Sequence, residues 1–146
     1  MELFSLAAFA ITLIFGTVAI HSVATFFMIR VTRKISGHPG YARITAGAAS
    51  RVLVLLLTHM LEIALWAVLY YKQDFFPDFH TSLYFSLHAA IGWGDVMLKE
   101  QYRMLGGIQA LVGVLMISWS TALLVGFLQR VYSPFIDGSK DPDRPP

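Results

Sequence analysis

The sequence predicts an all-α membrane protein in which three transmembrane helices are joined by loops, one of which folds back into the membrane. First, 56% of the 146 residues are hydrophobic and the mean hydropathy is +0.62, which is too apolar for an ordinary soluble domain. Second, three apolar segments each reach the roughly 20 residues that a helix needs to cross the hydrocarbon core. Third, the run Ile91-Gly92-Trp93-Gly94-Asp95 interrupts the apolar pattern between the second and third segments.

The first predicted element is a transmembrane helix in residues 1–29. Its apolar stretch contains no Lys or Arg. A secretory signal peptide is the alternative, but this segment carries Glu2 where a signal peptide would be basic, and it is longer than the usual apolar core. We therefore predict a helix that stays in the membrane.

Residues 30–51 are predicted to form a basic cytoplasmic loop. Pro39, between Gly37 and Gly40, indicates a turn. The segment has no acidic residue, and its charged residues are Arg30, Arg33, Lys34, Arg43 and Arg51. The positive-inside rule then places the N-terminus outside and the C-terminus in the cytoplasm, in what we expect to be a bacterial cytoplasmic membrane. Beyond setting topology, the loop could bind anionic lipid headgroups.

The next predicted unit is a domain that spans residues 52–130. It contains an outer helix (52–71), a short re-entrant helix (79–90), a non-helical return (90–95) and an inner helix (104–128). Residues 75–94 are too few to cross and return, and irregular backbone is tolerated at membrane depth where protein buries it or it lines water. Pro77 suits the entry of the short helix, and Asp78 or Thr81 could cap it. Residues 131–146, rich in Asp and Pro, are predicted to be a disordered cytoplasmic tail.

The glycine run has the composition of an ion-channel selectivity filter. Glycine at alternate positions relaxes the steric limits on the backbone, so successive carbonyl oxygens could face a common axis and replace the water around a cation. The preceding helix would aim its partially negative carboxyl end at the same ion. The carbonyls predicted to bind the ion are those of Ala90, Ile91, Gly92, Trp93 and Gly94. The side chains predicted to support this segment are His88 and Asp95. An interfacial aromatic helix followed by a glycine turn is the alternative for this segment.

Three further blocks of sequence support the interpretation of the glycine run as a filter: Ser82-Leu83-Tyr84-Phe85-Ser86-Leu87, Arg103-Met104-Leu105-Gly106-Gly107, and Ser118-Trp119-Ser120-Thr121-Ala122-Leu123-Leu124. Together with Gly-Trp-Gly-Asp they resemble the pore domain of the tetrameric potassium channels, whose signature is Thr-Val-Gly-Tyr-Gly-Asp. The first block is similar to the pore helix of small bacterial members, and the other two look like their final helix. The resemblance covers about Val52 to Arg130 and leaves the first helix as an addition. It implies a cyclic homotetramer with one filter segment from each copy.

The resemblance implies potassium as the conducted ion, but the filter departs from the family pattern. Ala90 takes the place of the threonine whose hydroxyl helps form the innermost ion site, and Trp93 takes the place of the tyrosine. The stretch between the pore-helix block and Ile91 is also shorter than in close relatives. Selectivity depends on how many carbonyls coordinate the ion and how firmly they are held. A weakly selective cation channel is therefore the alternative.

The last predicted helix contains hydroxyl groups and a glycine that matter to a pore. Ser118, Ser120 and Thr121 could line a hydrated cavity, or they could bond only to a neighbouring helix or their own backbone. Gly113 lies about where the resemblance implies a hinge in the inner helix. Close packing against another helix is the equal alternative.

One carboxylate, Glu62, interrupts the apolar interior of the second predicted helix. His59 lies three residues earlier on the same helical face, and His21 is expected at similar depth on the first helix. Because a charge inside a membrane is costly, Glu62 needs a partner or a proton. The two hypotheses for these three residues are a polar clasp between helices and a pH sensor.

Other classes of function are less consistent with the sequence. We expect no enzymatic activity, no cofactor, and no metal beyond the conducted cation. A haem- or metal-binding membrane subunit would have to use His21, His59 and His88, without any cysteine or His-Glu-x-x-His motif. An accessory membrane protein without conduction is a further alternative. The net charge of +2 does not indicate nucleic acid, so the expected partners are copies of this chain and membrane lipid.

Overall fold

The computed structural model describes residues 3–33 and 40–137, and within them the fold is entirely helical. Its elements in chain order are α1 (Leu3–Arg33), α2 (Tyr41–Lys72), α3 (Phe79–Ala90), the 3₁₀ turn η1 (Glu100–Tyr102) and α4 (Arg103–Asp137). Three segments are long and apolar enough to cross a membrane: Phe4–Val31, Tyr41–Lys72 and Glu100–Ser133. The predicted fold class is confirmed.

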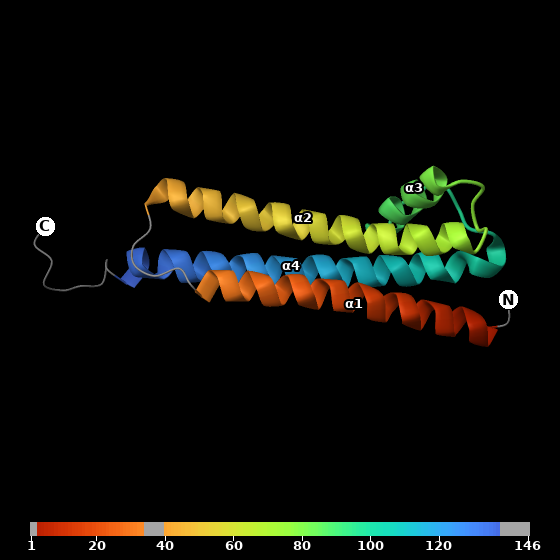
Figure 1. Cartoon of the computed structure of the whole chain (residues 1–146), viewed down its shortest axis with the longest axis horizontal. Coiled ribbons are helices and arrows are strands. Elements are labelled where there is room, and N and C mark those ends of the chain that lie inside the picture. Colours follow the sequence, from red (N-terminus) through yellow and green to blue (C-terminus); the bar gives the residue numbers. More distant parts are fainter. Residues whose placement is uncertain (1–2, 34–39, 138–146) are drawn as a thin grey trace, which may run out of the picture.

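The three long helices lie side by side, and each contacts the other two (Figure 1). α1 and α4 run in the same direction, with α2 antiparallel to both. The short helix α3 packs on α2 and α4 at the end of the bundle where α1 begins, and α4 ends at the opposite end (Figure 1). A short helix held between two long ones is the arrangement expected for a re-entrant segment.

The long helices extend beyond the predicted bounds, which corrects two of the expectations. The predicted basic loop of residues 30–51 is helical up to Arg33 and again from Tyr41, and residues 34–39 lie outside the described part. Four alanines between Tyr41 and Arg51 favour helix, and α2 begins directly after its N-cap, Gly40. The predicted tail of residues 131–146 is likewise helical up to Asp137, and the rest of it lies outside the described residues.

The main apolar core lies at the α3 end of the bundle, where aromatic rings from three helices meet. Tyr70 is completely buried, and its ring centroid lies 5.3 Å from that of Phe85 in an edge-to-face arrangement. Phe75 stacks on Tyr102 at 4.4 Å. Such aromatic pairs contribute about 0.5–1.5 kcal/mol each beyond their burial. The core therefore fixes α3 and the loop that follows it against α2 and α4.

The opposite end of the bundle is held by a second, smaller cluster. Phe127 of α4 packs with Ile44 of α2 and with Val131. The Arg51 guanidinium lies 3.9 Å from the centre of the Phe127 ring and also donates to the carbonyl of Gly47 at 2.8 Å. Cation–π contact with a desolvated ring is worth about 2 kcal/mol. This arginine therefore joins α2 to α4 instead of lying in a loop.

Candidate functional site: the pore-helix loop and a buried polar ring

α3 begins where the sequence places a capping residue. Asp78 has an extended backbone, and its side chain accepts hydrogen bonds from the Thr81 amide and the Thr81 hydroxyl, both at 2.8 Å. The bond from the Thr81 backbone is the largest cause that lowers the pKa of Asp78 below its ordinary value. Of the two capping candidates, Asp78 is the N-cap and Thr81 is its donor.

A buried chain of hydrogen bonds fixes the depth of α3 between its neighbours. The Ser86 hydroxyl donates to the Ile63 carbonyl of α2 at 2.8 Å. The Gln109 side chain of α4 donates to the Ser86 hydroxyl at 2.7 Å and to the Ser86 carbonyl at 3.1 Å. Tyr70 of α2 completes the chain by donating to the Gln109 side-chain oxygen at 2.9 Å. Sequence reasoning missed this network, although Gln109 is an isolated amide in an apolar helix and was a usable signal.

α3 ends in a Schellman motif that uses the first glycine of the predicted filter. The Gly92 amide donates to the Ala89 carbonyl at 3.0 Å, and the Trp93 amide donates to the His88 carbonyl at 2.9 Å. Gly92 has φ +76°, the left-handed conformation that this motif requires and that side chains disfavour. Within the subunit, the start of the predicted filter is therefore a helix C-cap.

Beyond the cap, the carbonyl oxygens of residues 91–94 accept no backbone hydrogen bond from the described residues. The side chain of Trp93 is 71% exposed, so it does not pack behind the loop within its own subunit. The loop is tied at its other end, where Leu98 is buried in the core and the Tyr84 hydroxyl donates to Asp95 at 3.1 Å. The segment that carries the free carbonyls is therefore anchored at both ends, by the helix C-cap on one side and by Asp95 and Leu98 on the other.

His88 supports the helix end more than the loop. Its Nδ1–H donates to the Tyr84 carbonyl one turn earlier at 2.8 Å, and its ring lies 4.1 Å from the Tyr84 ring. The Trp93 ring is edge-on to it at 6.0 Å. The structure therefore places His88 and Asp95 on either side of Tyr84, with neither side chain on the free carbonyls.

Gly113 lies where α4 passes closest to the end of α3. A Cβ atom at this position would overlap the backbone carbonyl of Ala90. Only glycine permits this approach, so the structure favours close packing as the reason for Gly113, and α4 is an uninterrupted helix through it. The hinge remains a sequence-based prediction.

The three hydroxyl residues of α4 fall on two different faces. Ser118 and Thr121 are exposed, and each hydroxyl donates to the carbonyl four residues earlier, at 2.8 and 3.0 Å. Ser120 is buried against α1 and α2, on a different face from the other two, and contacts neighbouring helices as the alternative for these hydroxyls expects. The reason is helical geometry, because a residue two positions from Ser118 points about 200° away from it.

His21, His59, Glu62 and Ser120 form a closed ring of polar contacts that joins all three long helices. The Nδ1 atoms of His21 and His59 lie 2.8 and 3.0 Å from the two carboxylate oxygens of Glu62. The Nε2 atoms of the same histidines face the Ser120 hydroxyl, at 3.5 Å for His21 and 3.0 Å for His59. His21 is completely buried, and the Glu62 side chain is 7% exposed. The expected proximity of His21, His59 and Glu62 is found, and Ser120 is the member that sequence reasoning missed.

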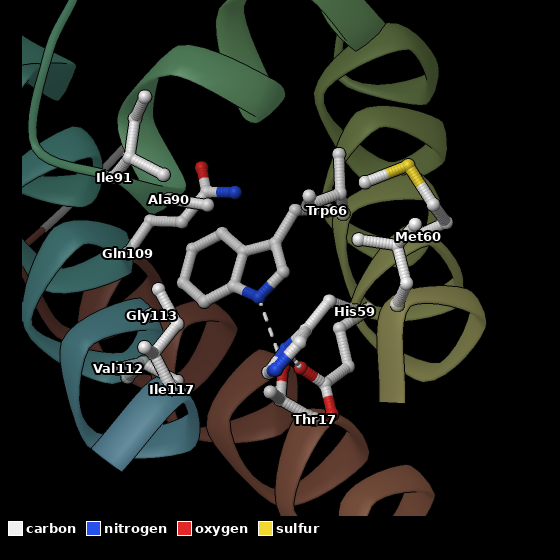
Figure 2. Close-up of a pocket in the computed structure, with 13 residues that line it drawn as sticks. Thr17, His59, Met60, Trp66, Ala90, Ile91, Gln109, Val112, Gly113 and Ile117 are labelled. Carbon is white, nitrogen blue, oxygen red and sulfur yellow. Dashed lines mark hydrogen bonds and ion pairs between the residues drawn. The ribbon is translucent and has the colours of Figure 1, made fainter. Parts of the chain in front are cut away.

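A cavity of about 260 Å³ links the ring to the end of α3. His59 and Glu62 line one part of it, and Ala90 and Ile91 line another. Figure 2 shows the Trp66 indole at the centre of this space, with its ring N–H directed at the Thr17 hydroxyl, 2.9 Å away. His88 is not among the lining residues, and the metal-competent donors that converge are His21, His59 and Glu62, within 4.8 Å of one another. The three histidines of the haem hypothesis are therefore not brought to one point.

Three membrane-length helices with a short helix and an irregular loop between the last two define the class of pore-forming membrane subunits. The model of a family described as "Ion channel" matches residues 54–130, slightly more than half of the chain. The chain belongs to this ion channel family, which is not a family of enzymes. No curated protein and no solved structure matches the chain. The family region contains α3, the loop and nearly all of the membrane-crossing part of α4, with α1 outside it.

Proposed function

We propose that this protein is a cation channel in which four copies arrange the loop after α3 around a common axis, with potassium as the conducted ion. The observation that carries the proposal is the row of free carbonyl oxygens at residues 91–94, directly after a helix carboxyl end. Carbonyl dipoles and the negative end of a helix both stabilise a cation. Ala90, whose carbonyl faces Gly113, is the innermost residue of the proposed filter.

The exposure of the loop supports assembly from several copies. Trp93 and Ile91 are 71% and 57% exposed, although both are large and apolar and follow a helix that is fixed in the core. A ring of carbonyls also needs several chains, since each chain supplies one loop. A homotetramer would cover these side chains against neighbouring copies and complete the ring. Ser118 and Thr121, exposed on α4, would then face the inner cavity of the pore.

A weakly selective cation channel is the second candidate. It is favoured by two features of the filter, since Ala90 supplies no hydroxyl ligand and the Gly92 amide is used to cap α3. Fewer or more loosely held ligands discriminate less well between potassium and sodium.

We also propose that the α3 end of the bundle faces the outside of a bacterial cytoplasmic membrane. The charged residues support this orientation. The α3 end has four acidic residues, Asp74, Asp78, Asp95 and Glu100, and three basic ones, Lys72, Lys99 and Arg103. The opposite ends of the long helices carry Arg30, Arg33, Arg43, Arg51 and Arg130, with Asp137 as the last residue of α4. The positive-inside rule then places the basic end in the cytoplasm.

Ion flux into liposomes that contain the purified protein tests the proposal, with potassium, sodium and calcium compared. Gly94→Leu is the informative variant, because a Cβ atom there meets Val96 only at an ordinary contact distance of 3.6 Å, so the subunit should still fold. Side chains from four copies would nonetheless crowd the filter axis. We expect potassium flux to be lost in this variant.

The matched control is Gly40→Leu, which has open space around its Cβ at the far end of the bundle and should keep the flux. Flux that survives in Gly94→Leu would contradict the filter. Equal potassium and sodium flux in the wild type would instead favour the weakly selective channel.

A further inference from the structure

The polar ring of His21, His59, Glu62 and Ser120 lacks one hydrogen. The Glu62 carboxylate accepts from Nδ1 of both histidines, so each neutral imidazole has a bare Nε2. Both Nε2 atoms face the hydroxyl of Ser120, which has a single hydrogen to donate. The closer contact, at 3.0 Å to His59, takes that hydrogen, and the 3.5 Å contact to His21 then joins two acceptors.

With Glu62 ionised and both histidines neutral, the ring would carry an uncompensated negative charge inside the membrane. Glu62 lies within the α2 span, nearer its Lys72 end. The other groups that face the ring are neutral: the Trp119 ring of α4, 5.2 Å from His21, and the cavity-lining residues of α2, α3 and α4. An anion at this depth is costly without a cation. The ring therefore needs either one more proton or a positively charged ligand.

We infer that His21, His59 and Glu62 bind a transition-metal ion of the zinc class, with Ser120 as the group that orients both imidazoles. Bound through Nδ1, each imidazole would have its hydrogen on Nε2 and could donate it to the Ser120 oxygen, which has two lone pairs. Every contact of the ring then joins a donor to an acceptor. Metal-bound histidines generally donate their second ring nitrogen to such a partner.

The donor set and its spacing fit this class of metal. Two imidazoles and one carboxylate form a set that binds zinc with a fourth position open, whereas magnesium and calcium prefer oxygen alone. Zinc bonds place tetrahedral donor atoms about 3.3 Å apart. The 2.8 and 3.0 Å separations each involve a different Glu62 oxygen, and the three ligand atoms all lie within 4.8 Å of one another. Small side-chain rotations would bring one donor atom of each residue to the tetrahedral spacing. The cavity that reaches His59 and Glu62 supplies an entry path and room for water at the fourth position.

The site would join the added helix to the pore-forming helices. His21 belongs to α1, outside the family region, while His59 and Glu62 belong to α2 within it. A bound metal would therefore fix α1 at the level of Ser120 on α4. This inference replaces the sequence-based expectation of no metal beyond the conducted ion, and it does not depend on the proposed channel activity.

Metal content of the full-length protein, purified in detergent and exposed to Zn²⁺ and then dialysed, tests the inference. We expect about one zinc per chain in the wild type, by elemental analysis, and less than a tenth of that in His21→Ala, His59→Ala and Glu62→Gln. His88→Ala is the control, because this histidine bonds to its own helix and should leave the metal content unchanged. Co²⁺ in place of zinc should give visible absorption bands in the wild type and not in the three site variants.

A second measurement, made on the wild type and on variants of Ser120 and Ser118, keeps the inference testable if a ligand variant fails to fold. Chelation of the zinc-loaded wild type should lower its melting temperature, and Zn²⁺ but not Mg²⁺ should restore it. Ser120→Ala should weaken zinc affinity about 10-fold to 100-fold, as loss of an outer-shell partner does. Ser118→Ala, whose hydroxyl bonds only within α4, should not.

Absence of bound zinc after loading would overturn the inference, as would equal loss of zinc in His88→Ala. In the first case a proton takes the place of the metal, and the ring is the polar clasp between helices that the sequence predicts.

Discussion

The two ends of the cavity differ in how their polar groups are satisfied. At the ring, each of the four side chains contacts at least one partner on another helix of the same chain. At the end of α3, the Gly92 and Trp93 amides are satisfied locally, but the carbonyls of residues 91–94 are left free. One chain is therefore enough to build the ring, whereas the proposed channel would complete the loop with further copies. The following predictions test this contrast.

The largest effect is expected at Gly113, where α4 packs directly against the backbone of Ala90 at the end of α3. Gly113→Val would force α4 away from the Ala90 carbonyl, and overpacking of this kind costs about 1–3 kcal/mol. We expect complete loss of ion flux and a lower melting temperature. Gly107→Val is the control on the same helix, because a Cβ atom there meets nothing within 4 Å. Flux retained in Gly113→Val would mean that the end of α3 need not stay in place.

A smaller overall effect, with a comparable loss of stability, is expected when the network that holds α3 is opened. Gln109→Leu leaves the buried Tyr70 hydroxyl without its acceptor, at a cost of about 1–3 kcal/mol. The double variant Gln109→Leu, Tyr70→Phe removes both partners and should recover part of that stability, as measured by thermal unfolding in detergent. If the double variant is less stable than the single one, Tyr70 does not depend on Gln109.

The contact between α1 and α2 should make a still smaller contribution. Thr17→Val keeps the shape of the side chain but removes the acceptor of the Trp66 indole N–H, which costs about 1 kcal/mol. Thr12→Val is the matched control, because this exposed hydroxyl bonds only to the Ala8 carbonyl. Equal melting temperatures for the two variants would show that the indole bond contributes nothing measurable.

The smallest effect concerns the N-cap of α3. Hydrogen bonds from Thr81 lower the pKa of Asp78 in the folded state. The cap therefore stabilises the fold at pH values above the pKa that Asp78 has in the unfolded chain. That contribution is lost as the pH falls through the lowered pKa of the folded state. Hydrogen exchange of the α3 amides should therefore speed up, relative to that of α2, on acidification. Asp78→Asn should remove this pH dependence, and exchange that stays pH-dependent in the variant would rule out Asp78 as its source.

The elements best predicted from the sequence were those with local signals. α3 spans Phe79–Ala90 as predicted, because Asp78 caps its start and Gly92 permits its end. The loop of residues 30–51 was too long in the prediction, because charge indicated a loop where alanine content favoured helix. Ser120 could not be assigned to one of its two expected roles because its partners, His21 and His59, come from distant parts of the chain. The geometry of the proposed filter cannot be predicted from local sequence patterns for the same reason, because the residues that would surround it belong to other copies of the chain.

The contact between Gly113 and Ala90 has a mechanical consequence. From Gly113 to its end at Asp137, α4 is a rigid arm of about 36 Å, so a tilt of about 10° around Gly113 would displace that end by about 6 Å. At the pivot of this arm, Gly113 contacts the Ala90 carbonyl, the innermost carbonyl of the proposed filter. If that proposal holds, a tilt of the basic end of α4 would act directly on the filter, because no other group lies between Gly113 and this carbonyl.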